Sequence, residues 1–403
     1  MYHIDIAYTI NHKYVKYLIV SLTSLFESNK RNHITLHIVF NDLTQSDQNY
    51  IDEFVQKNGG NCFFYYIDDL EFFKEFVSYG FGIEVFLRLY LPWKLLKITK
   101  VLYLDADTII KGDIGDFFSL DMEGYVLAGC LDGEYSKRLV ESRNDIFKRT
   151  DNFNYFNAGV MLWNLELIRT TIRFEDFINT IGIFGNRLFF NDQDILNYLF
   201  YQETRIIDGE RFNFMGNLYA NDPCFDKKVN SAKIIHYAGC NPWKKGWLER
   251  VDFDIWWNCA KKSDFYGAIV DETLRNTATM IDDIEKRYQM AKAYSEYKLR
   301  GGSLENNQIF KENKKIAIYG AGAWAKLLIE ELGEAKEKIQ FIFDKKTTGN
   351  IYGCKICNLS EIENANMVDI IIVTPSMHYD EIYMFLKTKI NIPILNLVEI
   401  WGD

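Results

Sequence analysis

The strongest chemical signal in the sequence is a pair of aspartates at the end of an apolar segment. Residues 101–104 read Val-Leu-Tyr-Leu and lead directly into Asp105, Ala106 and Asp107. Because alternate side chains of a strand share one face, both carboxylates are expected to point to one side of the strand end. Carboxylate oxygens are ligands that Mg²⁺ and Mn²⁺ prefer, and a divalent ion on a diphosphate makes it a good leaving group. The alternative is an acidic loop or helix cap, since Asp-x-Asp is common on its own.

Three later segments supply polar groups that could complete such a site. Residues 156–160, Phe-Asn-Ala-Gly-Val, predict a small turn where the backbone can approach a ligand closely. Residues 191–194, Asn-Asp-Gln-Asp, precede an apolar helix. The alternative is that they only form the N-cap and the acidic first turn of that helix. In residues 233–244, His236 ends an apolar strand before a Gly/Pro turn and a lysine. A hydrogen-bonded structural histidine is the alternative, but the distant aspartate pair makes His236 a candidate third metal ligand.

The elements that must position these groups alternate between strands and helices. We expect strands at 4–8, 34–40, 63–67 and 101–104, with helices at 15–28 and 45–58. This alternation favours an α/β domain with a largely parallel sheet. In such sheets, ligands bind at the carboxyl ends of the strands.

The order of these motifs resembles that of glycosyltransferase family 8, the retaining hexosyltransferases that include bacterial lipooligosaccharide galactosyltransferases and glycogenin. The resemblance covers residues 1–265 and includes Arg88, the aspartate pair, Asn-Ala-Gly, Asp-Gln-Asp and residues 211–215 and 236–243. It implies a nucleotide-sugar-binding (GT-A-like) fold with a mixed, mostly parallel sheet flanked by helices. The implied reaction moves glucose or galactose from a UDP-sugar to a carbohydrate, glycolipid or glycoprotein acceptor.

The resemblance also implies a role for each matching residue. Asp105, Asp107 and His236 would hold Mn²⁺, with Mg²⁺ as the alternative ion. The implied catalytic residues are Gln193, near the anomeric carbon, Asp192 and Asp107. The implied substrate-binding residues are Thr9, Asn11 and Tyr14 for the nucleotide, and Arg88, Asp105, Ala106, Asn157, Ala158 and Gly239 for the sugar and diphosphate.

The implied mechanism is attack of the acceptor hydroxyl from the face that the diphosphate leaves. Double displacement through Asp192 or Gln193 is the alternative. Two positions depart from the family pattern. Asn11-His12 stands where an acidic pair is usual, and Asn241 stands where a lysine usually precedes Pro-Trp. We expect Lys244 or Lys245 to replace the missing cation at the phosphate.

A second α/β block is expected at 313–403, after a helical linker at 266–312. Gly320 and Gly322 form G-x-G-x-x-A after a strand, and Asp344 ends the next strand, as in dinucleotide-binding folds. The block resembles the small Rossmann modules appended to some bacterial sugar-modifying enzymes. Gly320, Gly322 and Asp344 are therefore a candidate second nucleotide site. The alternative is a Rossmann-like half kept for packing or assembly.

Composition narrows the partners and the compartment. A net charge of −10 and a pI near 5.3 disfavour nucleic acid. A cytoplasmic protein is expected, because the seven cysteines are scattered and the start lacks signal-peptide features. No transmembrane segment is expected, because the sequence lacks a long apolar run. A peripheral location at the inner face of the membrane stays open. A homo-oligomer also stays open. Two other functions compete with transfer: a catalytically weak sugar-nucleotide-binding scaffold, and an NAD-dependent oxidoreductase acting through the C-terminal block.

Overall fold

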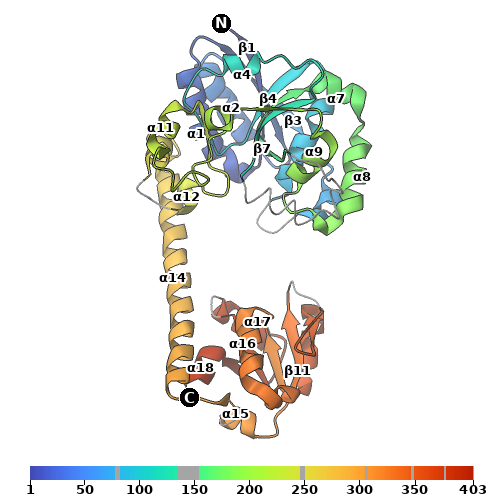
Figure 1. The fold of residues 1–403 in the computed structure, drawn as a ribbon, viewed down its shortest axis with the longest axis vertical. Coiled ribbons are helices and arrows are strands. Elements are labelled where there is room, and N and C mark those ends of the chain that lie inside the picture. Colours follow the sequence, from blue (N-terminus) through green and yellow to red (C-terminus); the bar gives the residue numbers. More distant parts are fainter. Residues whose placement is uncertain are drawn as a thin grey trace. The chain divides into compact units, whose positions relative to one another are not determined.

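The computed structural model describes residues 1–77, 82–133, 154–245, 250–304, 307–345, 349–375 and 378–402 of the chain. They form two compact units, Met1–Leu274 and Arg275–Asp403. The boundary lies inside one long helix, α14 (Tyr266–Leu299), which Figure 1 draws as a continuous ribbon. The predicted division at 265 and 312 differs from this partition and stays a prediction.

A seven-stranded sheet forms the centre of the first unit, in the order β3-β2-β1-β4-β7-β6-β8. β7 runs antiparallel to β4 and β6, whereas the other neighbouring pairs are parallel. The predicted mixed, mostly parallel sheet is confirmed. The strands are β1 (His3–Ile10), β2 (His33–Phe40), β3 (Asn61–Tyr66), β4 (Lys100–Leu104), β6 (Leu127–Leu131), β7 (Phe156–Asn164) and β8 (Thr204–Ile207).

Helices cover both faces of this sheet because the strand side chains alternate between two apolar clusters. Val39 and Tyr103 belong to one cluster, and their neighbours Ile38 and Leu102 belong to the other. Figure 1 shows α1 and α2 on one side of the strands and α7 and α8 on the other. The helices of the unit are η1 (His12–Tyr14), α1 (Val15–Ser28), α2 (Gln45–Lys57), η2 (Glu71–Phe76), η3 (Ile83–Tyr90), α3 (Leu91–Lys94), α4 (Gly115–Phe118), α7 (Leu165–Thr171), α8 (Phe174–Phe184), η4 (Gly185–Arg187), α9 (Asp192–Phe200), α10 (Gly209–Phe212), α11 (Phe225–Ser231), α12 (Pro242–Lys245) and α13 (Val251–Ala260).

Two sequence expectations were wrong at the places where chemistry was expected. The segment 156–160 is no turn: it lies in β7, which pairs with β4 and β6. The strand before the aspartate pair ends at Leu104, so Asp105 and Asp107 lie in the turn between β4 and β5 (Thr108–Ile110). The carboxylates therefore converge because of a turn and not because of strand alternation. The predicted helix at 15–28, by contrast, coincides with α1.

A small second sheet brings the histidine to the aspartates. β5 pairs antiparallel with β9 (Ile234–His236), and Thr108 lies opposite His236. The chain after β9 is held by aromatic stacking, since the ring of Trp243 lies 3.9 Å from that of Tyr17 on α1. A strand pair and a stacked tryptophan thus position a segment more than a hundred residues away from the aspartates in the sequence.

The second unit contains a six-stranded sheet in the order β12-β13-β11-β10-β14-β15, parallel except for the β12–β13 pair. Apart from β12, this is the third-second-first-fourth-fifth order of nucleotide-binding doubly wound folds. Its elements are α15 (Gln308–Lys311), β10 (Ile316–Tyr319), α16 (Ala323–Leu332), η6 (Gly333–Lys338), β11 (Ile339–Asp344), β12 (Gly349–Ile351), β13 (Cys354–Asn358), η7 (Leu359–Met367), β14 (Ile370–Val373), α17 (Tyr379–Lys387), β15 (Ile394–Asn396) and α18 (Leu397–Gly402).

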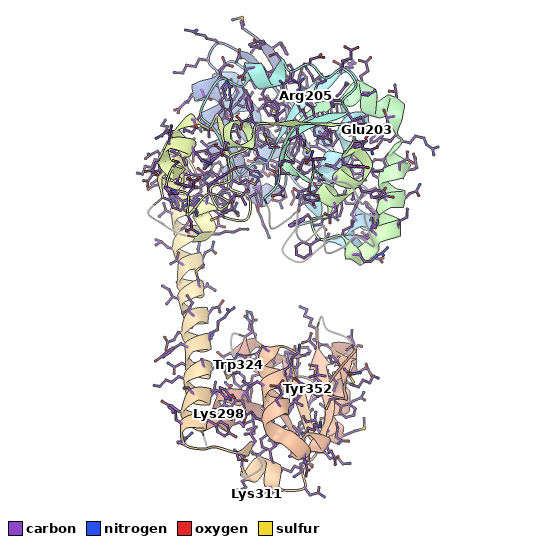
Figure 2. The ribbon with its side chains drawn as sticks, in the orientation of Figure 1. Glu203, Arg205, Lys298, Lys311, Trp324 and Tyr352 are labelled. Carbon is purple, nitrogen blue, oxygen red and sulfur yellow. The ribbon has the colours of Figure 1, made fainter. Side chains whose placement is uncertain are left out.

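The end of α14 packs on this second unit. Tyr294 of α14 meets Trp324 of α16 edge-on, with ring centroids 6.2 Å apart, and Lys298 forms an ion pair with Glu331. Trp324 and Lys298 are labelled in Figure 2. Tyr297 is buried in the same apolar cluster. α14 carries charged side chains along its length, and no helix in the described part of the chain has the length and apolar character needed to cross a membrane.

Candidate active site

A cavity of about 730 Å³ opens where β1 and β4 end, within the usual size range of small-molecule sites. Every site residue that the sequence predicted for the first unit lines it: Thr9, Asn11, Tyr14, Arg88, Asp105, Ala106, Asp107, Asn157, Ala158, Asp192, Gln193, His236, Gly239 and Lys244. The structure therefore brings these residues together, although the role of each stays a prediction.

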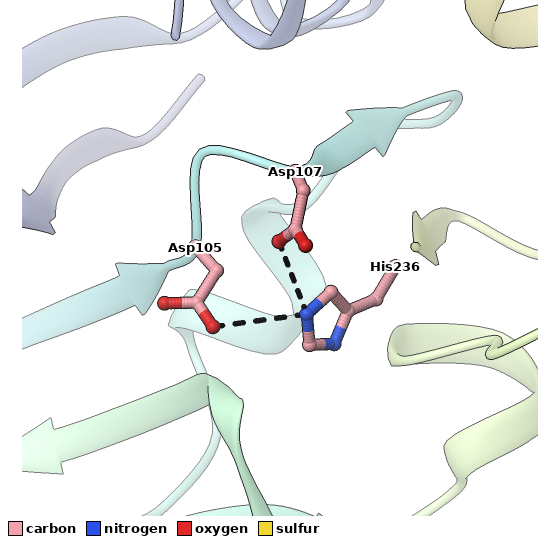
Figure 3. A group of neighbouring side chains, drawn as sticks. All are labelled: Asp105, Asp107 and His236. Atoms are coloured by element: carbon pink, nitrogen blue, oxygen red, sulfur yellow. Dashed lines mark ion pairs between the residues drawn. The ribbon is translucent and has the colours of Figure 1, made fainter. Parts of the chain in front are cut away.

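Asp105, Asp107 and His236 form a cluster at the wall of this cavity. Their ligand atoms lie within 4.8 Å of one another. His236 Nε2 is 3.2 Å from Asp107 Oδ1 and 3.7 Å from Asp105 Oδ2, as Figure 3 shows. Two carboxylates and an imidazole are a donor set that fits a divalent cation.

Gly159 of β7 makes room for this cluster. A Cβ atom at this position would lie 2.2 Å from His236 Cε1 and 2.7 Å from Asp105 Oδ2. Neither contact is tolerable, because real Cβ atoms do not approach so closely. The sequence predicted close backbone approach at this glycine. In the structure, its close neighbours are the side chains of the candidate metal ligands Asp105 and His236.

Each aspartate has one oxygen held by protein donors and the other turned toward the histidine. Asp105 Oδ1 accepts hydrogen bonds from Tyr103 Oη at 2.7 Å and Arg88 Nη2 at 3.0 Å. Asp107 Oδ2 accepts one from Asn241 Nδ2 at 2.9 Å. Asp105 Oδ2 and Asp107 Oδ1 are thereby left to face His236, so the carboxylates are oriented before any ligand binds.

A chain of buried side-chain amides sets the orientation of the imidazole. His236 Nδ1 lies 2.9 Å from Asn213 Oδ1, Asn213 Nδ2 donates to Asn157 Oδ1 at 3.0 Å, and Asn157 Nδ2 donates to Gln193 Oε1 at 3.2 Å. Gln193 Nε2 then donates to Asp132 Oδ2 at 2.8 Å. Backbone N–H groups of β7 donate to Asn157 Oδ1 and Gln193 Oε1 and so assign both amide orientations. The proton of His236 therefore belongs on Nδ1, and the Nε2 lone pair faces the aspartates.

The electrostatics of the cluster favour a positive charge between its members. Burial would lower the pKa of His236, but Asp107 and Asp105 outweigh burial and raise it. Burial would raise the pKa of Asp107, but His236 and Asn241 outweigh it and lower it. A proton or a cation at His236 Nε2 would satisfy both groups, so the site fits a divalent metal ion by charge as well as by ligand type.

Arg88 links the cluster to a second buried carboxyl group. Its Nε lies 3.0 Å from Asp192 Oδ2, and its Nη2 contacts Asp105. Burial raises the pKa of Asp192 to about 7, although Arg88 opposes the shift. Burial would lower the pKa of Arg88, but the neighbouring carboxylates outweigh burial and raise it. One permanent cation thus separates two acidic groups on the cavity wall.

The segment after His236 differs from the family pattern in a way that the structure explains. Asn241 is buried, and its Nδ2 donates to the backbone oxygen of Tyr237 at 3.1 Å as well as to Asp107. It orients a carboxylate and supplies no cation. Lys244 on α12 is exposed and lines the cavity. The side chain of Lys245 lies outside the described residues, so the predicted phosphate contact stays a prediction for both lysines.

The residues predicted to hold the nucleotide also make local contacts. Asn11 Oδ1 accepts a hydrogen bond from Tyr14 N at 3.1 Å and caps η1. Thr9 Oγ1 lies 2.8 Å from Tyr103 Oη. Since the Tyr103 hydroxyl donates to Asp105, Thr9 donates to Tyr103. These bonds fix the cavity wall near the end of β1.

The candidate second nucleotide site lies in the other unit. Gly320 has φ of +96°, and a Cβ there would lie 2.8 Å from Thr374 Oγ1. Gly322 precedes α16. Asp344 Oδ2 accepts a hydrogen bond from Ala321 N at 2.8 Å. One oxygen of the predicted ribose-binding acid thus holds the glycine loop, and ligand binding there stays a prediction.

Sequence analysis missed several polar groups of the first cavity. Glu84, Asp132 and Asn217 line it, and Asn213 orients the histidine from behind. Asp132 had a usable signal, because it directly follows an apolar strand and precedes a glycine, much as Asp105 directly follows β4. The sequence also predicts that the acceptor site is built from loops at 72–82 and 133–155. These segments lie partly outside the described residues, at 78–81 and 134–153.

Comparisons with known proteins agree with the fold. The profile of Glycosyl transferase family 8 matches residues 5–248, so the chain belongs to this family. A putative glycosyltransferase of Haemophilus influenzae is 27% identical over 253 residues, which cover 60% of this chain and 73% of the relative. The lipopolysaccharide 1,2-glucosyltransferase of Escherichia coli is 26% identical over 267 residues, covering 63% and 77%.

Solved structures show the same fold. The galactosyltransferase LgtC, crystallised with donor and acceptor sugar analogs, matches with a TM-score of 0.56 at 24% identity, over 65% of this chain and 96% of that chain. The protein is a glycosyltransferase with a GT-A fold, as the family resemblance predicted.

Proposed function

We propose that this enzyme moves a hexose, glucose or galactose, from a UDP-sugar to a carbohydrate, glycolipid or glycoprotein acceptor, with Mn²⁺ and with retention of configuration. The observation that supports this most is the convergence of Asp105 Oδ2, Asp107 Oδ1 and His236 Nε2 at one cavity. The names of two relatives, a lipopolysaccharide 1,2-glucosyltransferase and a lipopolysaccharide 1,3-galactosyltransferase, favour a hexose. Mg²⁺ suits the carboxylates equally well, whereas the imidazole favours Mn²⁺.

In this proposal, Asp105, Asp107 and His236 hold the metal ion. A bound divalent cation supplies charge neutralisation for the departing diphosphate. The protein's part is orientation: Tyr103 and Arg88 hold Asp105, Asn241 holds Asp107, and Asn213 holds His236. Because these partners are buried or partly buried, the ligands keep their positions without reorganising when the donor binds.

The remaining cavity residues would bind the donor. Thr9, Asn11 and Tyr14 would contact the nucleotide, Ala106 and Gly239 the ribose and diphosphate, and Arg88, Asn157, Ala158 and Asp192 the sugar, all from the wall of the same cavity. Arg88 keeps its charge through its acidic neighbours. Catalysis would then consist mainly of positioning and charge stabilisation.

Two observations favour same-face attack over double displacement. Both ends of the Gln193 amide are engaged, by Asp132 on one side and by Asn157 and Ala158 N on the other. Asp192 is buried against Arg88, and its raised pKa keeps much of it protonated near neutral pH. Neither group is thus poised as a nucleophile. The acceptor hydroxyl would attack from the leaving-group side and give its proton to a diphosphate oxygen.

Asn241 favours a second candidate function, a catalytically weak sugar-nucleotide-binding scaffold. The amide holds Asp107 and offers no positive charge to a leaving diphosphate. A protein of this kind would bind UDP with the metal ion but release little product. Lys244 on the cavity wall is the feature that argues for turnover.

One pair of measurements separates these candidates. Donor hydrolysis is followed over a panel of UDP-sugars with and without Mn²⁺, and UDP binding is measured by calorimetry under the same conditions. Metal-dependent hydrolysis of UDP-glucose or UDP-galactose supports the enzyme, whereas tight metal-dependent UDP binding without hydrolysis supports the scaffold. Binding and hydrolysis that both ignore the metal would contradict the proposed site. Nicotinamide absorbance with NAD in the same panel tests the oxidoreductase alternative.

The remaining assignments are also proposals. We propose that 1–265 carries transfer, that 266–312 connects it to 313–403, and that the protein acts in the cytoplasm, including at the inner face of the membrane. An acceptor embedded in a membrane would require the protein to act at the inner face of the membrane. Cell fractionation followed by a salt wash distinguishes a peripheral pool from a free one.

A further inference from the structure

The long helix α14 carries an exposed apolar stripe with coiled-coil spacing. Leu274 is 55% exposed, Ile281 62%, Ile284 59% and Tyr288 59%. Their spacings of seven, three and four residues are those of the a and d positions of a heptad repeat. A row of large apolar side chains in water indicates a surface that another element covers.

α14 packs on the core of the second unit with a different face from the stripe. Met290 and Tyr297 are buried, at 0% and 5% exposure, in the apolar cluster of the second unit. At about 100° per residue, they lie roughly 180° and 160° around the helix from Ile281. The helix is therefore apolar on two faces, of which its own core uses only one.

Polar side chains separate the stripe from the rest of the helix surface. Asp282, Asp283, Lys286 and Gln289 occupy the positions between the apolar residues, and Asp282 pairs with Lys286. A helix that merely crosses water would need no stripe of this kind. The pattern is that of one strand of a two-helix seam.

We infer that the stripe is covered by α14 of a second copy of this chain, in antiparallel orientation. A two-fold axis between Asp282 and Asp283 would place Ile281 against the partner's Ile284 and Leu274 against the partner's Ala291. The same axis places Tyr288 against the partner's Thr277. The two isoleucines then pack against each other at the centre of the seam, and large side chains face small ones on either side of it. One stripe thus complements itself, as a two-fold interface must.

The flanking charges favour this orientation. In the antiparallel pair, Lys292 lies beside the partner's Asp271, which is an opposite-charge contact. A parallel pair would instead place Arg287 beside the partner's Lys292, which is a like-charge contact, and would set each bulky stripe residue against its own copy. Charge complementarity therefore selects a second copy in the antiparallel arrangement.

Solution mass is the first test. Light scattering on the full chain, over a range of concentrations, is expected to approach twice 47.4 kDa for the wild type. The variant I281E/I284E is expected to remain at one chain mass, because the charges would lie in the seam. The control N276E/T279E adds the same number of charges roughly 140° and 160° around the helix from Ile281, away from the stripe, and is expected to keep the dimer. Donor hydrolysis and circular dichroism show whether each variant is folded. A wild type of single-chain mass at every concentration would overturn the inference, and a stripe covered by the chain itself, another protein or a lipid surface would then explain the exposure.

Disulfide trapping tests the orientation without relying on the charged variant. Leu274→Cys and Ala291→Cys chains are mixed and oxidised, with wild type as the background for the seven native cysteines. An antiparallel seam gives cross-linked dimer only in the mixture, because identical positions would lie about 25 Å apart along the axis. Cross-linking of Leu274→Cys alone would show a parallel pair and overturn the proposed arrangement, and no cross-link above background would contradict the interface itself.

Discussion

In the first unit Gly159 lies against Asp105 and His236, and in the second unit Gly320 lies against Thr374 and Pro375. In both units an aspartate ends or follows a strand beside the glycine. Asp105 keeps one oxygen facing other ligand atoms at a cavity, whereas Asp344 uses one oxygen to bind the N–H of Ala321 in the glycine loop. Similar local sequence signals thus belong to a candidate metal-binding cluster in one unit and hold a backbone turn in the other.

The difference lies in what surrounds the carboxylates. Asp105, Asp107 and Asp192 gather around one cavity with Arg88 and His236, and their mutual repulsion is offset only in part by these partners. Such clustering is costly for folding and is therefore typical of functional sites. A glycine next to an acidic residue therefore indicates a functional site only when the fold brings further charged groups to the same cavity.

The sharpest test of this contrast replaces one aspartate in each unit. Asp107→Ala is expected to lower transfer by about 1000-fold or more, since a lost ligand removes several kcal/mol of charge stabilisation. Asp344→Ala is the matched control and is expected to leave turnover within about two-fold. Steady-state transfer and circular dichroism on both proteins provide the measurement. A folded Asp107→Ala enzyme with near-wild-type turnover would remove the metal assignment.

The glycines give a second matched pair. Gly159→Ala is expected to reduce transfer by about 100-fold, because its Cβ would displace His236 and Asp105. Gly320→Ala is expected to lower thermal stability but to leave transfer nearly unchanged, since φ is +96° there and Thr374 is the displaced neighbour. Activity and melting temperature are measured for both. Equal loss of activity in the two variants would erase the distinction between the units.

The histidine and its amide partner test how the ligand is oriented. His236→Ala is expected to weaken Mn²⁺ and UDP binding together, and Asn213→Ala to lower Mn²⁺ affinity by about 10-fold, within the range usual for partners of metal ligands. Calorimetric titration of Mn²⁺ in the presence of UDP measures both. Titration curves that match the wild type would return His236 to a structural role.

An effect of similar size is expected at Asn241. Asn241→Ala removes the donor to Asp107 Oδ2, and a hydrogen bond to a charged group contributes about 1.5–3 kcal/mol, so Mn²⁺ affinity should fall by roughly 10-fold or more. Asn241→Asp removes the same donor but adds a negative charge that attracts the cation, so Mn²⁺ affinity should fall less than in Asn241→Ala. Variants that bind Mn²⁺ as tightly as the wild type would show that Asp107 is held by other groups.

The smallest effect is expected at the lysines of α12. Lys244→Ala is expected to lower turnover several-fold while UDP binding changes less, because the charge on the diphosphate grows as the bond breaks. Lys245→Ala and the double variant complete the series. Donor hydrolysis and UDP calorimetry are compared for all three. Unchanged turnover in the double variant would show that neither lysine replaces the family's lysine, whose position Asn241 occupies.

Much of this architecture could be predicted from local pattern. The predicted helix at 15–28 coincides with α1, and the strand predicted before Gly320 is β10. Apolar periodicity and flanking polar residues specify such elements within a short window. The metal-type residues Asp105, Asp107 and His236 were likewise predicted, through their types and their order along the chain.

Other features depended on contacts between distant segments. The sequence of 156–160 suggested a turn, but pairing with β4 and β6 makes it a strand. Asn241 marked only a missing lysine until the fold placed it on Asp107, and Asn213 had no role until β9 brought His236 beside it. Residue types and order therefore identified the family and its chemistry. Tertiary packing decided which oxygen faces the histidine and which amide orients it, because hydrogen-bond partners 134 residues apart (Asn241 and Asp107) or 23 apart (Asn213 and His236) leave no signal in a local sequence window.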